Sequence, residues 1–155
     1  MTERAGPRSA EALVVVERLG LAPHPEGGWF RRTWTAPDAT GARRGSGSSI
    51  VYLVEGGAGS RWHRIDASEL WQHAAGAAVE LSTWPGAGEV TSQALGPDVL
   101  GPEVPQLVVE PGVWQSARST GEWSLVVCVV VPEFRDEGFE LAPPDWEPPG
   151  RQPPR

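Results

Sequence analysis

Two histidines and a glutamate near the middle of the chain are the residues best suited to chemistry. His63, Glu69 and His73 fall within eleven residues of one another. If the segments around them are strands, alternate side chains share a face, which aligns His63 with Ile65 and Glu69 with His73. With both faces turned inward, two imidazole rings and one carboxylate share a cavity. Such a set can bind a transition metal or act as a metal-free acid and base, and periodicity does not choose between them.

A second group of candidates surrounds a turn nearer the N-terminus. His24 and Glu26 precede Gly27, Gly28 and the aromatic Trp29. Glycines let a backbone pass close to a ligand, and an aromatic side chain can form the wall of a cavity. The same residues could equally form a purely structural turn. We therefore treat His24, Glu26 and Trp29 as candidate ligand-binding residues.

Two further aromatic residues are candidates for the same cavity. Trp71 lies between Glu69 and His73 on the expected inward face. There it can stack on a ligand ring, or screen Glu69 from water and so raise the pKa of that carboxyl group. Tyr52 shares a face with Ile50, which suits a core side chain as well as a cavity hydroxyl.

The composition restricts the classes of function. The 155 residues fit one folding domain. Thirteen basic against twenty acidic residues give a net charge of −7 without a long basic cluster, which argues against nucleic-acid binding. The single cysteine, Cys128, lies in an apolar run and cannot form an intramolecular disulfide. Because no apolar signal region follows Met1 and no run of about eighteen apolar residues occurs, we expect a cytoplasmic protein that does not enter membranes.

The elements that would position these side chains are mostly strands. Residues 9–19 have helical spacing, with Ser9 as a cap and Gly20 as a terminator. After this helix come short runs separated by turn residues, a pattern typical of an all-β sandwich or barrel. The runs span residues 29–35, 49–54, 61–65, 69–74, 79–84, 107–109 and 124–131.

The chain divides into a flexible N-terminus over residues 1–8, one domain over 9–142, and a disordered or extended tail over 143–155. Six prolines in this tail cannot contribute to a sheet. Within the domain, the runs 50–54 and 125–131 are apolar on both faces, so each needs a cover on both sides. The N-terminal helix can supply one cover and a second subunit the other, which predicts a homodimer.

Parts of the sequence resemble the two cupin motifs. Residues 110–115, Glu-Pro-Gly-Val-Trp-Gln, are similar to the second motif, in which a Pro-x-Gly turn precedes a metal-binding histidine. Two ligand positions of the cupin pattern are changed, because Ile65 replaces the second histidine of the first motif and Gln115 replaces the histidine of the second. The spacing of the first motif is matched by Gly57, His63, Glu69 and Gly76.

A closer resemblance covers residues 19 to 141. The sequence over these residues is similar to the cupin-5 family, also called DUF985, whose biochemical role is largely unassigned. The resemblance implies an all-β, RmlC-like cupin fold, a double-stranded β-helix or jelly-roll barrel with a short N-terminal helix, assembled as a dimer. Sugar-nucleotide epimerases are among the structural relatives of this family. The matching blocks are residues 21–31, 49–53, 62–64, 68–71, 95–96, 131–134 and 139–141.

These features together predict an enzyme that acts on a small polar metabolite by acid/base chemistry, of the epimerase, isomerase or lyase type. We expect His63 to be the general base or acid and Glu69 to orient it or share its proton. His73 would complete the relay or bind the substrate. Other ligand contacts are expected from His24, Glu26, Trp29, Tyr52, Trp71 and Gln115.

Two alternatives remain open from the sequence. The changed ligand positions favour a non-catalytic cupin that binds or senses a metabolite. A metal-dependent oxygenase is a third reading, in which His63, Glu69 and Gln115 would hold Fe, Mn, Ni or Zn. Catalytic metal sites typically keep three protein ligands, so we rank a metal-free cavity above a metal site, and no cofactor is firmly implied.

Overall fold

The computed structural model describes residues 7–41, 43–57 and 59–149. Residues 1–6 of the expected flexible N-terminus and residues 150–155 of the expected tail lie outside the described residues. Among the described residues, no helix is both long enough and apolar enough to cross a membrane.

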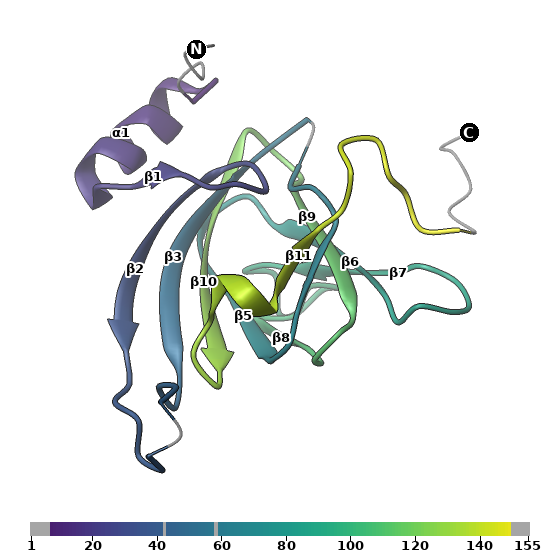
Figure 1. The fold of residues 1–155 in the computed structure, drawn as a ribbon. Coiled ribbons are helices and arrows are strands. Elements are labelled where there is room, and N and C mark those ends of the chain that lie inside the picture. The colour runs from purple at the N-terminus through teal and green to yellow at the C-terminus, as the bar shows by residue number, and fades with distance from the viewer. Residues whose placement is uncertain (1–6, 42, 58, 150–155) are drawn as a thin grey trace.

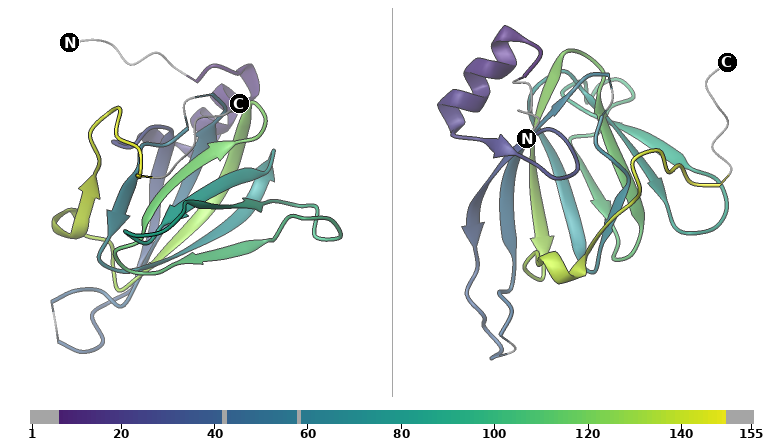
Figure 2. Two further views of the ribbon diagram at one scale, coloured as in Figure 1. Left: turned by 90° about the vertical axis from the view of Figure 1, so that its right-hand side faces the viewer. Right: turned by 45° about the horizontal axis from the view of Figure 1, so that its top comes forward.

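Two antiparallel sheets that face each other make up the described part of the chain (Figures 1 and 2). The six-stranded sheet has the order β1-β2-β3-β10-β5-β8, and the five-stranded sheet has the order β11-β4-β9-β6-β7. Several neighbouring strands are distant in sequence, among them β3 and β10, β5 and β10, and β4 and β9, as a jelly roll requires. The prediction of an all-β cupin jelly roll with a short N-terminal helix is therefore confirmed. The strands are β1 (Ala22–Pro23), β2 (Trp29–Thr35), β3 (Ser48–Glu55), β4 (His63–Ile65), β5 (Ser68–Gly76), β6 (Val79–Trp84), β7 (Thr91–Leu95), β8 (Gln106–Val109), β9 (Trp114–Ser119), β10 (Trp123–Val131) and β11 (Phe139–Leu141).

Helix α1 (Ala10–Leu19) covers one end of the outer face of the six-stranded sheet (Figure 1). The side chain of Ser9 accepts a hydrogen bond from the backbone N–H of Ala12, and Gly20 ends the helix in the left-handed conformation. Ala12 and Val16 pack with the fully buried Leu53 of β3. The helix thus gives β3 an apolar cover on the outside of the barrel.

The space between the sheets is filled at one end and hollow at the other. Along β10, Val126 belongs to the apolar core, and Cys128 both packs in this core and lines a cavity. Val130 lines the cavity and packs with a separate small cluster that contains Ile65. The same change occurs along β5, where Trp71 lies in the core and Glu69 lines the cavity. The alternation of side chains along these strands therefore places core and cavity on one continuous inner surface.

The C-terminal segment, residues 142–149, packs on the outer side of the five-stranded sheet. The ring of Trp146 lies 4.7 Å from that of Trp114 between centroids, and 6.3 and 6.0 Å from the rings of Trp62 and Trp84. The indole N–H of Trp62 donates to Glu147 at 3.0 Å. The described part of the expected tail contains a turn, closed by the backbone N–H of Trp146 donating to the carbonyl of Pro143, and it is anchored by aromatic contacts.

Candidate functional site

A cavity of about 480 Å³ opens between the sheets, a volume typical of small-molecule sites. Its polar side chains come from the loop before β2, from strands β2, β3, β4, β5 and β10, and from residues 135–137, so both sheets contribute to it. The polar groups deepest in this cavity are His24, Glu26, Tyr52, His63, Glu69 and Cys128.

A tight turn carries Glu26 into the cavity. The backbone N–H of His24 donates to the carbonyl of Gly28 at 2.9 Å, and that of Gly27 donates to the carbonyl of His24 at 3.1 Å. Gly28 has a φ of +76°, and a Cβ atom there would clash with the carbonyl of Leu53 and the ring of Tyr52. Only glycine fits this close approach, so the His-Pro-Glu-Gly-Gly sequence forms a turn that delivers a buried carboxyl group.

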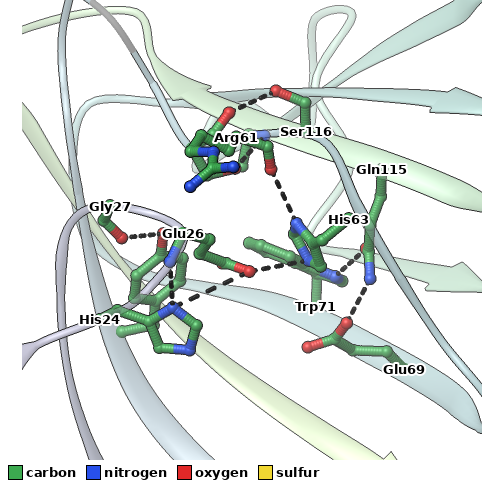
Figure 3. Close-up of polar contacts among 12 residues, drawn as sticks. His24, Glu26, Gly27, Arg61, His63, Glu69, Trp71, Gln115 and Ser116 are labelled. Atoms are coloured by element: carbon green, nitrogen blue, oxygen red, sulfur yellow. Dashed lines mark hydrogen bonds and ion pairs between the residues drawn. The ribbon is translucent and has the colours of Figure 1, made fainter. Parts of the chain in front are cut away.

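Glu26 and His63 form a buried ion pair. Nε2 of His63 lies 3.0 Å from Oε2 of Glu26, and the two side chains are 3% and 5% exposed (Figure 3). Nδ1 of His63 lies 2.9 Å from the carbonyl oxygen of Arg61, which can only accept, so Nδ1 carries a proton. Burial alone would lower the pKa of His63, but the charge and hydrogen bond of Glu26 outweigh it and raise this pKa to about 9. His63 is therefore an imidazolium at neutral pH.

The carboxyl group of Glu26 is correspondingly ionised. Burial alone would raise its pKa, but the charge of His63 and the hydrogen bond from it lower the pKa below the ordinary value. Nδ1 of His24 accepts a hydrogen bond from the backbone N–H of Glu26 at 3.1 Å. The 3.9 Å contact of the same nitrogen with Oε2 of Glu26 is therefore not a hydrogen bond. Glu26 and His63 thus form a fixed carboxylate–imidazolium pair.

Glu69 is the second carboxyl group of the cavity, and its environment is different. Burial raises its pKa to about 7, and the charge of Glu26 adds to this while the charge of His63 opposes it. Its oxygen Oε2 accepts a hydrogen bond from the amide of Gln115, whose carbonyl oxygen accepts from the indole N–H of Trp71 at 2.9 Å (Figure 3). An indole nitrogen can only donate, so Trp71 fixes the orientation of the amide. Oε2 of Glu69 accepts this hydrogen bond, which makes Oε1 the better site for a proton on Glu69.

Tyr52 and Cys128 complete the deep end as neutral groups. The hydroxyl of Tyr52 donates to the carbonyl of Gly27 at 2.6 Å. Burial and the charge of Glu26 raise the pKa of Tyr52 well above its ordinary value. Burial and the charge of Glu69 likewise raise the pKa of the Cys128 thiol. Neither group is therefore an activated nucleophile at neutral pH.

The structure brings five of the sequence candidates together and separates the others. His24, Glu26, Tyr52, His63 and Glu69 all line the cavity. Gln115 and Trp71 are buried, 0% and 1% exposed, and do not line the cavity. They orient Glu69 through hydrogen bonds, because Trp71 donates to Gln115 and Gln115 donates to Glu69.

Two sequence candidates lie away from the cavity. Nε2 of His73 is 3.2 and 3.1 Å from the carbonyl oxygens of Gly76 and Ala77, at the far end of β5. The indole N–H of Trp29 donates to Glu55 at 3.4 Å, and its ring packs beneath helix α1. Neither side chain lines the cavity, so His73 has no place in a relay with His63.

Sequence reasoning did not identify the apolar walls and the charged rim. The rim carries Arg32 and Arg135, with Asp136 and Glu137 beside them. Phe139 could have been a candidate for the cavity wall, because it belongs to one of the blocks that resemble the family. Phe30 could have been a second one, because it lies two residues before Arg32 and therefore on the same face of β2. The apolar walls are Phe30, Ile50, Ile65, Val130, Phe134 and Phe139.

The donor set does not suit the metal ion that the cupin pattern implies. Nδ1 of His63 donates to the carbonyl of Arg61 and Nε2 pairs with Glu26, so in this arrangement neither ring nitrogen is presented to a metal. The amide of Gln115 is engaged on both sides, and Ile65 is apolar. Over residues 7–41, 43–57 and 59–149, no three His, Cys, Asp or Glu side chains are grouped so that they could hold a metal.

Comparison with known proteins places this geometry in a family. A sequence profile described as "Cupin superfamily (DUF985)" matches residues 14–142. A crystal structure of a Shewanella oneidensis protein is 33% identical with a TM-score of 0.78, covering 83% of this chain and 82% of that one. A hypothetical protein from Leishmania major is 25% identical with a TM-score of 0.75, covering 86% of each chain.

A more distant likeness extends to a protein whose activity is named. A dTDP sugar isomerase from Desulfovibrio desulfuricans is 19% identical with a TM-score of 0.57, covering 81% of this chain and 80% of that one. At this identity the likeness establishes the fold alone. No curated protein matches the sequence.

Proposed function

Because this chain belongs to the DUF985 family of the cupin superfamily, we propose that it binds a small polar metabolite in the cavity and exchanges a proton with it. The reaction would be of the epimerase, isomerase or lyase type. The shared fold of the dTDP sugar isomerase is compatible with this class, but a fold does not carry a substrate from one protein to another. The proposal therefore depends on the side chains of the cavity.

One observation carries the proposal, the separation in proton affinity between two buried carboxyl groups. Glu26 is ionised and paired with His63, whereas the pKa of Glu69 is raised to about 7. Two carboxyl groups whose environments separate their pKa values are the usual signature of an acid/base site. A group with a pKa near the working pH is also the most effective at both taking and giving a proton.

The roles follow from the hydrogen bonds. Glu69 takes or gives the proton through Oε1, since Gln115 holds Oε2 as an acceptor. The imidazolium of His63, held by Glu26, stabilises negative charge that develops on the ligand when a proton is removed. His63 is thus assigned electrostatic stabilisation and Glu69 the proton transfer.

The test begins with a ligand. Thermal-shift screening against sugars, nucleotide sugars, organic acids and amines finds compounds that bind the folded state. Each compound that binds is then incubated with the protein in D2O, and NMR measures the deuterium that enters its carbon positions. We expect Glu69→Gln to abolish the exchange, while Glu80→Gln, which removes a carboxylate paired with Arg118 outside the cavity, keeps it. Undiminished exchange in Glu69→Gln would remove Glu69 from the reaction.

A second candidate is a protein that binds or senses a metabolite without changing it. It is favoured by the geometry of His63, both of whose ring nitrogens are engaged within the protein. The same experiment separates the two candidates. A ligand that raises the melting temperature but acquires no deuterium, and is recovered unchanged, would favour the binding protein.

We also propose a homodimer, built on the outer face of the six-stranded sheet. Beyond helix α1 this face leaves large apolar side chains in water, with Trp34, Val108 and Val131 about half exposed. A second copy of the chain would cover them. Sedimentation velocity should give twice the mass of one chain, and Trp34→Glu with Val131→Glu should reduce it to one. A wild-type monomer at micromolar concentration would refute the proposal.

A cytoplasmic location is proposed on one feature. The single thiol, Cys128, is fully buried beside Glu69 and has no second cysteine to pair with, which suits a reducing compartment. Fractionation of cells that make the protein tests this location.

A further inference from the structure

The buried carboxyl group of Glu69 in the cavity has no ion-pair partner among the described residues. Glu26 and His63 lie 3.0 Å apart and neutralise each other. Glu69 is 7% exposed, and the partners found for it among the described residues are the amide of Gln115 and the thiol of Cys128, both uncharged. A buried carboxylate without a counter-ion is costly. Glu69 is therefore stabilised either by a proton or by a cation that enters the cavity.

Aromatic rings form much of the wall around this carboxyl group. Phe30, Phe134 and Phe139 all line the cavity. The ring of Phe139 lies 5.8 Å from that of Phe134 and 5.7 Å from that of His63, so these rings form one continuous surface. The faces of aromatic rings carry negative potential and attract organic cations. The aromatic wall and the carboxylate of Glu69 therefore both favour a positively charged ligand.

The cationic side chains at the rim are already engaged. One nitrogen of Arg32 lies 3.0 Å from Oε1 of Glu133, and the other donates to the carbonyl of Phe134 at 3.0 Å. Arg135 donates to the carbonyl of Arg43. An anion entering the cavity would have to compete with Glu133 for Arg32. The net charge of −7 also makes the protein as a whole attract cations rather than anions.

From these observations we infer that the metabolite carries a cationic nitrogen, as an ammonium group, and that this group contacts Glu69 between the aromatic walls. The inference rests on the proposed function, because it places the ligand in the same cavity. The ammonium group supplies the missing counter-ion, so binding no longer requires a proton on Glu69. The substrate class is thus a small amine, in which the proton exchange occurs next to the charged nitrogen.

Three probes of one shape and different charge test the inference. Benzylamine, benzyl alcohol and benzoate fit a cavity of about 480 Å³, and titration calorimetry measures the affinity of each. We expect benzylamine to bind at least about tenfold more tightly than benzyl alcohol, with benzoate weakest. Glu69→Gln should reduce the ratio of amine to alcohol affinity to about one. Glu80→Gln removes the same charge outside the cavity and should leave the ratio unchanged.

The outcomes separate this inference from the proposed function. If benzyl alcohol or benzoate binds as tightly as benzylamine, the cation preference is wrong while a small-molecule cavity still stands. A preference for the amine that persists in Glu69→Gln would also overturn the inference, since the field of the whole protein would then explain it. If none of the three probes binds at millimolar concentration, both the inference and the proposed function are refuted. Circular dichroism and thermal unfolding confirm that each variant is folded.

Discussion

Removal of the carboxylate of Glu26 should change how stability depends on pH. In the wild type the pKa of His63 rises from 6.5 to about 9. One pKa unit corresponds to about 1.4 kcal/mol, so the difference of about 2.5 units is a contribution of about 3 kcal/mol to the free energy of unfolding. His63 is 3% exposed, so solvent screens this contribution little.

The sign of the effect follows from the direction of the pKa change. A group whose pKa is raised in the folded state stabilises it fully below the unfolded pKa of 6.5, and this stability is lost as the pH rises through about 9. About 2 of the 3 kcal/mol should be lost between pH 7 and pH 9. Glu26→Gln removes the main cause that raises the pKa of His63 and leaves the opposing effect of burial, so this loss should become much smaller.

Chemical denaturation at steps between pH 7 and pH 9 measures the effect. The range stops at pH 9 because the thiol of Cys128 and the phenol of Tyr52, with raised pKa values of their own, contribute above it. NMR titration of the imidazole ring reports His63 directly in the wild type, even if Glu26→Gln proves too unstable to study. Glu80→Gln removes an exposed pair and should keep the wild-type slope.

Two results would refute the reasoning. One is an imidazole ring of His63 that titrates near pH 6.5 in the wild type, which would mean that Glu26 does not raise the pKa of His63. The other is a folded Glu26→Gln variant whose stability falls between pH 7 and pH 9 as steeply as that of the wild type.

Three further predictions concern the same site. Because the pKa of Glu69 is raised from 4.5 to about 7, this group contributes to the free energy of unfolding below pH 4.5, and the contribution is lost as the pH rises through 7. Chemical denaturation of Glu69→Gln should show no such loss of stability. A pH dependence of stability equal to that of the wild type would contradict the raised pKa. His73→Ala removes hydrogen bonds to two backbone carbonyls, so it should cost about 1 kcal/mol of stability and leave ligand affinity in calorimetry unchanged; a loss of binding would return His73 to the site. Protein purified without an affinity tag and dialysed should hold well below one metal ion per chain in elemental analysis, and stoichiometric Fe, Mn, Ni or Zn would overturn the metal-free assignment.

The inward face of the site could be predicted from the sequence because strand periodicity is local. His63 and Glu69 line the cavity, as their alternation predicted. The same rule put His73 on the inward face, but four residues along a strand span about 13 Å. The side chain of Trp71 fills the space between, so the cavity ends before it reaches His73.

The partner of His63 could not be predicted in this way. Glu26 was a candidate because it belongs to a glycine-rich turn, but its contact with His63 joins residues far apart in the sequence. Such a contact depends on how the turn folds over the barrel, and that is set by the close approach of Gly28 to Leu53. Local patterns carry no information about this distance.

Several strands also escaped prediction because their side chains are polar. The strand β9, Trp-Gln-Ser-Ala-Arg-Ser, has no apolar alternation, yet Gln115 within it is fully buried. Its burial is offset by hydrogen bonds to Trp71 and Glu69 rather than by apolar contacts. A buried polar network is thus invisible to a hydrophobic pattern.

The wall behind His63 is supplied by a part of the chain that also reaches the outside. Phe139 starts β11, which pairs with β4 at the edge of its sheet, and the chain then continues to Trp146 on the outer surface of the five-stranded sheet. A single short replacement over residues 139–147 would therefore exchange one side of the pocket and its external anchor together. We expect that grafting this stretch from a relative would change the ligand preference while the remaining strands are left as they are.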